Sequence, residues 1–232
     1  IEELLFTDKK DWTEEQVRAV INDNKSSTFN ENVKDILDNV DDTKLTPQAK
    51  TAKALLLKWD GSHNLTSTEP TIFYKLLFNV YKMSIEDELG SEVFTTFQNN
   101  FNLKRNTTAF FKNNASRWWD NTKTKVVESR KDIFTAALNK SLVDLNTQLG
   151  SNMSTWVWST VHTIEHKHPL GVVPVIGKFF NVGPIPVPGG RETIYSLTFN
   201  MDSTGNYKVE HGPALRRIID FKTPEKGYSV NP

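Results

Sequence analysis

Three closely spaced histidines are the first residues whose types could do chemistry. His162, Glu165 and His166 follow the pattern H-x-x-E-H of some zinc peptidases, and His168 adds another imidazole. The pattern binds zinc only on a continuous helix, because residues four positions apart then present both imidazoles to one ion. A proline and a glycine-rich stretch follow at once, and residues 156–164 are as typical of a strand. We therefore expect His162 to be structural, with a zinc peptidase as the less favoured interpretation.

Two further patterns could bind anions. Gly189-Gly190 resembles part of a phosphate loop, but no Lys-Ser/Thr pair follows, and a strand rather than a helix is expected next. Arg216 and Arg217 with Asp220 could bind a carboxylate. On an alternating strand the two arginines point to opposite faces, so a structural salt bridge is the favoured use of one of them.

Two acidic clusters, at residues 41–42 and 86–88, lack the spacing of a calcium loop. They are typical of solvated turns or of helix starts, where the helix dipole favours negative charge. From the residues alone, we assign no catalytic, cofactor-binding or metal-binding residue to this sequence, and no cofactor.

Composition excludes several classes of function. The 232 residues include 28 basic and 28 acidic side chains, so no broad basic surface for nucleic acid is expected. No apolar run approaches the ~18 residues of a membrane span, and the opening Ile1-Glu2-Glu3 is not typical of a secretory leader. The absence of cysteine excludes disulfides, thiolate metal ligands and a cysteine nucleophile.

Helices are predicted through the first three quarters of the chain. Capping boxes begin at Thr13 and Thr28, while Pro47 and Pro70 each fit the first turn of a helix. Helix-spaced apolar residues follow each start. The sequence predicts helices that start near residues 13, 28, 46 and 70, short helical pieces at 85–89 and 92–97, and a last long helix over about 129–149.

An aromatic-rich region lies before the last long helix. Its members are Phe101, Phe110, Phe111, Trp118 and Trp119. Such a cluster could stack a ligand, but helix-spaced aromatic residues more often belong to a core. We expect a core.

The stretch over residues 151–190 predicts an extended connector. Between Gly171 and Gly190 it contains five glycines and four prolines, which exclude a long helix. Apolar residues run through it, so we expect a buried connector rather than a solvated linker; they are Val172, Val173, Val175, Ile176, Phe179, Phe180 and Val182.

The pattern changes again after Gly190. Residues 195–201 alternate between apolar and polar, residues 202–206 supply a turn, and the alternation resumes at Tyr207, which predicts a hairpin. Residues 215–221 are a further strand candidate. The sequence thus predicts an α+β chain with a helical region at 1–150, a Gly/Pro-rich connector at 151–190 and C-terminal antiparallel strands at 191–232 that complete a larger sheet.

Short motifs spread over residues 45–220 together resemble one family, the penicillin acylases (penicillin amidases), which are N-terminal-nucleophile hydrolases. The resemblance is to the C-terminal part of the family's β-chain. The motifs are 57–61 (LKWDG), 72–74 (IFY), 87–90 (DELG), 156–158 (WVW) with His162, 168–170 (HPL), 180–184 (FNVGP), 188–190 (PGG) with Thr193, and 211–213 (HGP) with Arg216 and Asp220.

The resemblance implies hydrolysis of linear amide bonds in acylated β-lactams or acyl-homoserine lactones. The family's nucleophile is an N-terminal serine freed by autocleavage, whose α-amine accepts the hydroxyl proton. The opening of this chain resembles the helix after the family's catalytic arginine, so we expect serine, asparagine and arginine to lie upstream of Ile1. The family's calcium ligands and acyl pocket would lie there too.

The expected molecule is therefore a scaffold, a fragment of a layered N-terminal-nucleophile hydrolase that is inactive alone. Its expected partner is the missing N-terminal part of its own precursor, that is, the α-chain and the N-terminal part of the β-chain. We expect a small acyl-amide substrate only in the full enzyme, and no nucleic acid or membrane as a partner. We also expect self-association of the isolated chain and a periplasmic or secreted location. The alternative is a non-catalytic interaction module.

Overall fold

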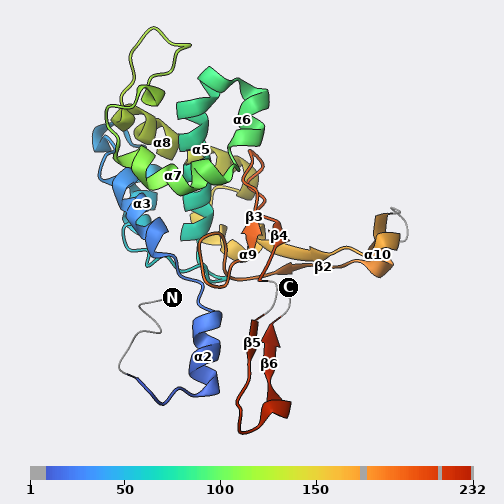
Figure 1. Ribbon diagram of the computed structural model, residues 1–232. Helices are drawn as coiled ribbons and strands as arrows, with labels where there is room; N and C mark the ends of the chain where they lie inside the picture. The colour runs from blue at the N-terminus through green and yellow to red at the C-terminus, as the bar shows by residue number, and fades with distance from the viewer. Residues whose placement is uncertain (1–8, 173–176, 214–215, 231–232) are drawn as a thin grey trace.

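The computed structural model describes residues 9–172, 177–213 and 216–230 of the chain (Figure 1). Its α-helices are α2 (Glu14–Ile21), α3 (Ser27–Leu37), α4 (Pro47–Leu56), α5 (Glu69–Leu89), α6 (Ser91–Phe97), α7 (Phe101–Lys112), α8 (Arg130–Leu149), α9 (Trp158–Val161) and α10 (Gly177–Phe180). Short 3₁₀ turns are η1 (Asp42–Lys44), η2 (Arg117–Trp119), η3 (Met153–Thr155), η4 (Pro169–Val172) and η5 (Pro224–Lys226).

Helix α5 is the centre of the helical layer. Most of its residues are buried, and α8 packs along it while α3, α4, α6 and α7 surround the pair (Figure 1). Burial on nearly all sides places α5 in the core, where each of its faces has a packing partner. Helix α2 contains no buried residue and lies apart, against β5.

Local start signals place most helices where the sequence predicts them. Thr13 caps α2 with the full capping box, and Ser129 caps α8 in the same way. Thr46 caps α4, whose first residue is Pro47. The box predicted at Thr28 is wrong, because the Ser26 hydroxyl accepts from the Phe29 N–H and α3 begins earlier.

Helix α5 is longer than the sequence suggests. The predicted separate piece at 85–89 is the end of α5, which continues to Leu89 and stops at Gly90. Gly90 adopts a φ of 77°, a left-handed conformation that glycine accepts readily, and α6 then starts in a new direction.

The strands form three small antiparallel pairs. They are β1 (Thr163–His166) with β2 (Val182–Pro186), β3 (Thr198–Phe199) with β4 (Val209–His211), and β5 (Arg216–Ile218) with β6 (Tyr228–Val230). The hairpin predicted after residue 195 is confirmed as β3–β4, although it is shorter. The chain is thus mixed, mainly helical with a few small antiparallel strands, as an α+β class requires. The predicted boundaries at 150 and 190 stay a prediction.

The connector differs from its predicted form. Its start folds into α9 and β1, and β1 pairs with β2 in an arm that projects from the helical body, with α10 near its tip (Figure 1). Phe179 is 84% exposed, and Phe180 and Val182 are exposed too, so the expectation of burial is wrong for these residues. Helix α9 contacts β2, but these three side chains stay exposed. Val173, Val175 and Ile176 lie outside the described residues.

The aromatic cluster is core for the most part, as expected. Phe111 and Trp119 are buried, and the Trp119 ring stacks on Phe110 with the ring centres 4.2 Å apart. Phe101 and Trp118 are exposed. None of the described helices has the length and apolarity that crossing a membrane requires.

Candidate functional site

Five aromatic side chains from distant parts of the chain meet beside helix α5, and we call them the aromatic junction: His63, Tyr74, Trp158, His162 and Tyr207. All five are nearly or wholly enclosed. Trp158 lies between Tyr74 and His162, with ring centres 5.4 Å and 4.6 Å away and both pairs nearly parallel. Residues far apart in the chain are thereby packed into one unit.

His63 is held by a chain of hydrogen bonds. Its Nδ1 lies 3.1 Å from the Asn24 carbonyl oxygen and 3.0 Å from that of Gly61, so Nδ1 carries the proton and donates. Its Nε2 then accepts from the Tyr74 hydroxyl, 3.2 Å away, and that hydroxyl accepts from the Arg191 backbone N–H, also at 3.2 Å. Burial lowers the pKa of His63 to about 4, so the ring is neutral at pH 7.

His162 has a structural environment. Its Nδ1 donates to the Tyr207 carbonyl oxygen at 2.7 Å, and burial lowers its pKa to about 4. It ends α9 and is followed by strand β1, whose last residue His166 is exposed. The helical spacing that zinc requires is absent here. Among the residues with described positions, no group of three or more His, Asp or Glu side chains is placed to hold a metal.

The junction also fixes the Gly189-Gly190 pair. The Gly189 N–H donates to the His63 carbonyl at 3.0 Å, and its own carbonyl accepts from the Trp158 indole at 2.9 Å. A Cβ on Gly190 would lie 2.9 Å from the His63 ring and 3.2 Å from the Tyr74 hydroxyl. These glycines therefore allow close approach of the backbone to the junction, and turns follow them rather than a helix, so no phosphate loop forms.

Next to the junction is a cavity of about 240 Å³ between α3, α5 and α7, which we call the Arg191 cavity. Arg191, Lys104 and Arg105 contribute positive charges to it, and Glu192 contributes the one carboxylate among its lining residues. Arg191 is not among the residues predicted from the sequence. In the sequence, the only indication of a functional role for this residue is its position directly after two glycines in an apolar stretch.

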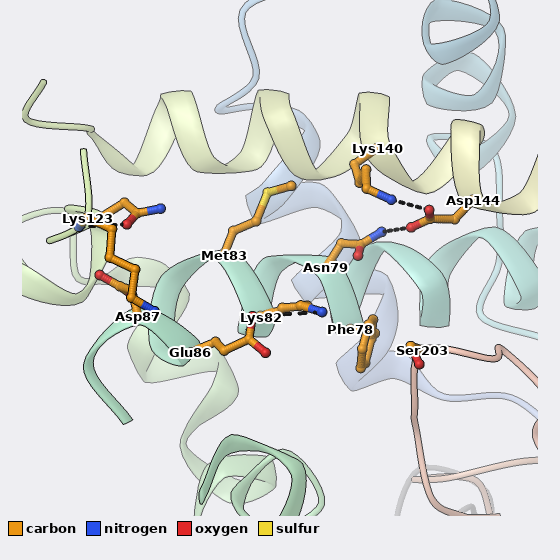
Figure 2. A pocket seen from close by; sticks show the side chains of 11 residues that line it. Phe78, Asn79, Lys82, Met83, Glu86, Asp87, Lys123, Lys140, Asp144 and Ser203 are labelled. Carbon is orange, nitrogen blue, oxygen red and sulfur yellow. Dashed lines mark hydrogen bonds and ion pairs between the residues drawn. The ribbon is translucent and has the colours of Figure 1, made fainter. Parts of the chain in front are cut away.

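A second, polar cavity of about 300 Å³ lies between α5 and α8 (Figure 2). Its charges are matched within the protein, because Lys140 pairs with Asp144, and the Lys82 amino group lies 3.8 Å from the Glu86 carboxylate. The Asn79 amide donates to Asp144 at 3.1 Å. This cavity has no net charge to attract a ligand.

A carboxyl pair lies at the end of α5. Burial, then a hydrogen bond and repulsion from Asp87, raise the pKa of Glu88 to about 7. Asp87 accepts from the Thr122 N–H at 2.6 Å and from its hydroxyl at 2.9 Å. Burial opposes ionisation of Asp87, but its hydrogen bonds outweigh burial and lower its pKa. Because the pair lies at the end of a helix, the expectation of a helix-start charge is wrong for it.

The remaining predicted candidates either have structural roles or are exposed. Arg216 donates to the backbone carbonyls of Ile21, at 2.6 Å, and Ile194, so the predicted salt bridge of an arginine on this strand is wrong for the described residues. Arg217 and Asp220 are exposed. At 41–42, Asp41 caps η1, as expected for a helix start, and Asp42 pairs with Lys53 at 2.8 Å.

Sequence comparison agrees with the motifs. The chain matches the penicillin amidase family over residues 1–232. It is 24% identical over 201 residues to the acyl-homoserine lactone acylase QuiP of Pseudomonas aeruginosa, which covers 79% of this chain and 24% of that protein. It is 26% identical over 183 residues to the QuiP of Pseudomonas fluorescens, which covers 77% of this chain and 21% of that protein. The chain thus spans about a quarter of the length of these relatives. It belongs to the penicillin amidase family.

Proposed function

We propose that this chain is the C-terminal scaffold region of an acylase that hydrolyses linear amide bonds in small acylated compounds. The observation that carries the proposal is the alignment itself, in which nearly four fifths of this chain corresponds to about a quarter of two acylases. In the proposed enzyme, the other three quarters supply the N-terminal serine, its α-amine and the groups that stabilise the oxyanion.

The chemistry of the aromatic junction supports a scaffold role. Both buried histidines use Nδ1 to hold backbone carbonyls, and both have a pKa of about 4, far below that of an efficient base at neutral pH. The Tyr74 hydroxyl is engaged by His63 and by the Arg191 backbone. The junction is thus suited to holding distant chain segments together.

The three antiparallel strand pairs support docking onto the rest of the enzyme. Each described sheet has two strands, so strand edges are open for further pairing. The arm formed by β1 and β2 adds the exposed apolar side chains of Phe179, Val182 and Ile185. We propose that these edges complete the layered sheet of an N-terminal-nucleophile hydrolase.

For the substrate of the whole enzyme we propose an N-acyl-homoserine lactone, since both relatives carry that activity in their names. Cleavage of the amide bond would release a carboxylic acid and homoserine lactone. A periplasmic or secreted location is part of the proposal and rests on the family resemblance. Fractionation of cells that express the complete reading frame, with immunodetection of this chain, tests it.

The activity test compares two proteins. The complete reading frame and residues 1–232 alone are purified, incubated with acyl-homoserine lactones of several chain lengths, and assayed for the released amine. We expect turnover only by the complete protein. The matched control exchanges the serine that becomes its N-terminus for alanine, which should abolish turnover without loss of folding. Turnover by residues 1–232 alone would contradict the proposal and favour a self-sufficient enzyme.

A further inference from the structure

Arg191 is buried without a partner for its charge. Only 6% of its surface is exposed, and its Nη1 is fully enclosed. Within residues 9–172, 177–213 and 216–230, no hydrogen bond or ion pair reaches its guanidinium group; only its backbone is bonded, to Tyr74. An enclosed guanidinium without an acceptor is unfavourable, and such groups normally face a ligand, an ion or water.

The neighbouring carboxylate does not neutralise Arg191. Glu192 is the next residue, but its Oε1 lies 2.8 Å from the amino group of Lys104. Arg105 also lines the Arg191 cavity, and its guanidinium lies over the Phe101 ring, 5.3 Å from the ring centre. The cavity therefore has an excess of positive charge, with Arg191 its most buried member.

The charge of Arg191 acts on the cavity wall. Burial raises the pKa of Tyr81 to about 12, while a hydrogen bond to Thr107 and the nearby Arg191 charge both act to lower it. Tyr81 and Arg191 both line the cavity, and the Arg191 charge is close enough to Tyr81 to affect its pKa.

The other walls are suited to a short apolar group. Phe29 of α3 and Leu77 of α5 are buried apolar residues that line the cavity, together with the Tyr74 ring. Its volume of about 240 Å³ is below the ~300–1,000 Å³ typical of sites for drug-sized ligands, which limits the occupant to a small molecule.

We propose that the Arg191 cavity binds a small organic carboxylate, with the Arg191 guanidinium on the carboxylate and Phe29 and Leu77 beside its apolar tail. The planar guanidinium suits this ligand because it can donate two parallel hydrogen bonds to the two carboxylate oxygens. The site does not depend on the proposed acylase activity, since it is formed within this chain.

The test uses the whole 232-residue chain, with butyrate as the probe and butyramide as its uncharged match in shape. Thermal unfolding and a titration of the Arg191 Nε–H signal by NMR follow binding. We expect butyrate to raise the unfolding temperature and shift that signal, and butyramide to do neither. Acetate should bind more weakly than butyrate, because it lacks the tail.

Two variants locate the site. Arg191→Gln should weaken butyrate binding about tenfold or more, because it removes a charged hydrogen-bond pair. Arg217→Gln removes an exposed charge from β5 and should bind as the parent chain does. Equal responses to butyrate and butyramide, an unchanged response in Arg191→Gln, or no response up to tens of millimolar would each overturn the proposal. If Arg191→Gln does not fold, the comparison of the two probes on the parent chain decides.

Discussion

The same substitution at two neighbouring tyrosines of the aromatic junction should have clearly different effects on stability. Tyr74 and Tyr207 are both almost fully buried, and their ring centres lie 5.5 Å apart. The Tyr74 hydroxyl bonds to His63 and to the Arg191 backbone, whereas the Tyr207 hydroxyl has no partner among the described residues. Replacement by phenylalanine keeps each ring and removes only the hydroxyl.

The magnitude follows from what each change leaves unpaired. Tyr74→Phe deprives His63 Nε2 and the Arg191 N–H of their partner, and each buried polar group left alone costs about 1–3 kcal/mol. We expect a loss of about 2–4 kcal/mol in the free energy of unfolding, or about 5–15 °C in unfolding temperature for a chain of this size. Tyr207→Phe removes a hydroxyl whose burial is uncompensated, so stability should change by less than about 0.5 kcal/mol or rise.

Urea unfolding of the parent chain and both variants, followed by tryptophan fluorescence, measures the difference. Equal losses would refute the hydrogen-bond chain through Tyr74, because the two rings would then contribute only by packing. A larger loss for Tyr207→Phe would show that its hydroxyl has a partner, and the assigned geometry would be wrong.

Three further predictions use the same unfolding assay or a hydrodynamic one. His63 and His162 have pKa values of about 4 in the folded state, against about 6.5 when unfolded, so the unfolded chain binds more protons between these pH values. The free energy of unfolding should therefore fall by up to about 3 kcal/mol per histidine as the pH drops from 6.5 to 4. Constant stability over that range would contradict this prediction. Gly190→Ala should cost about 1–3 kcal/mol because its Cβ would meet the His63 ring. Gly227→Ala is the control, because its φ is −55° and the atom nearest to the added Cβ lies 3.4 Å away. It should change stability by less than about 0.5 kcal/mol, and an equal loss at the two positions would refute the steric argument. Phe179→Ser, at an exposed position on the arm, should change the free energy of unfolding by less than about 0.5 kcal/mol. It should reduce self-association as measured by sedimentation velocity. Unchanged self-association would exclude Phe179 on the arm as the cause of that association.

Features that depend on neighbouring residues in the chain could be predicted from the sequence. The start of α2 at Thr13 and of α4 at Pro47 follow from side chains that satisfy the first free N–H groups or lack one. The hairpin of β3 and β4 follows from alternation around a turn. The box at Thr28 failed because Ser26 offers the same cap two residues earlier, and local chemistry does not rank the two.

Features that depend on distant residues could not be predicted. Apolar content in the connector indicates burial but not its partner, so the exposure of Phe179 on the arm was missed. The Arg191 cavity is formed by α3, α5, α7 and the segment after Gly190, which meet only in three dimensions. The role of Tyr74 in bonding the Arg191 backbone, 117 positions away, has no signature along the chain.

The aromatic junction has a consequence for how the molecule would respond to proteolysis. Trp158 and His162 precede the arm of β1 and β2 in the chain, while Gly189 and Tyr207 follow it, and hydrogen bonds join the two sides. A single cut in the arm would therefore leave two pieces that remain bound to each other under native conditions and separate only in denaturant. Such a nicked form would elute as one species, and its break would be visible only on a denaturing gel.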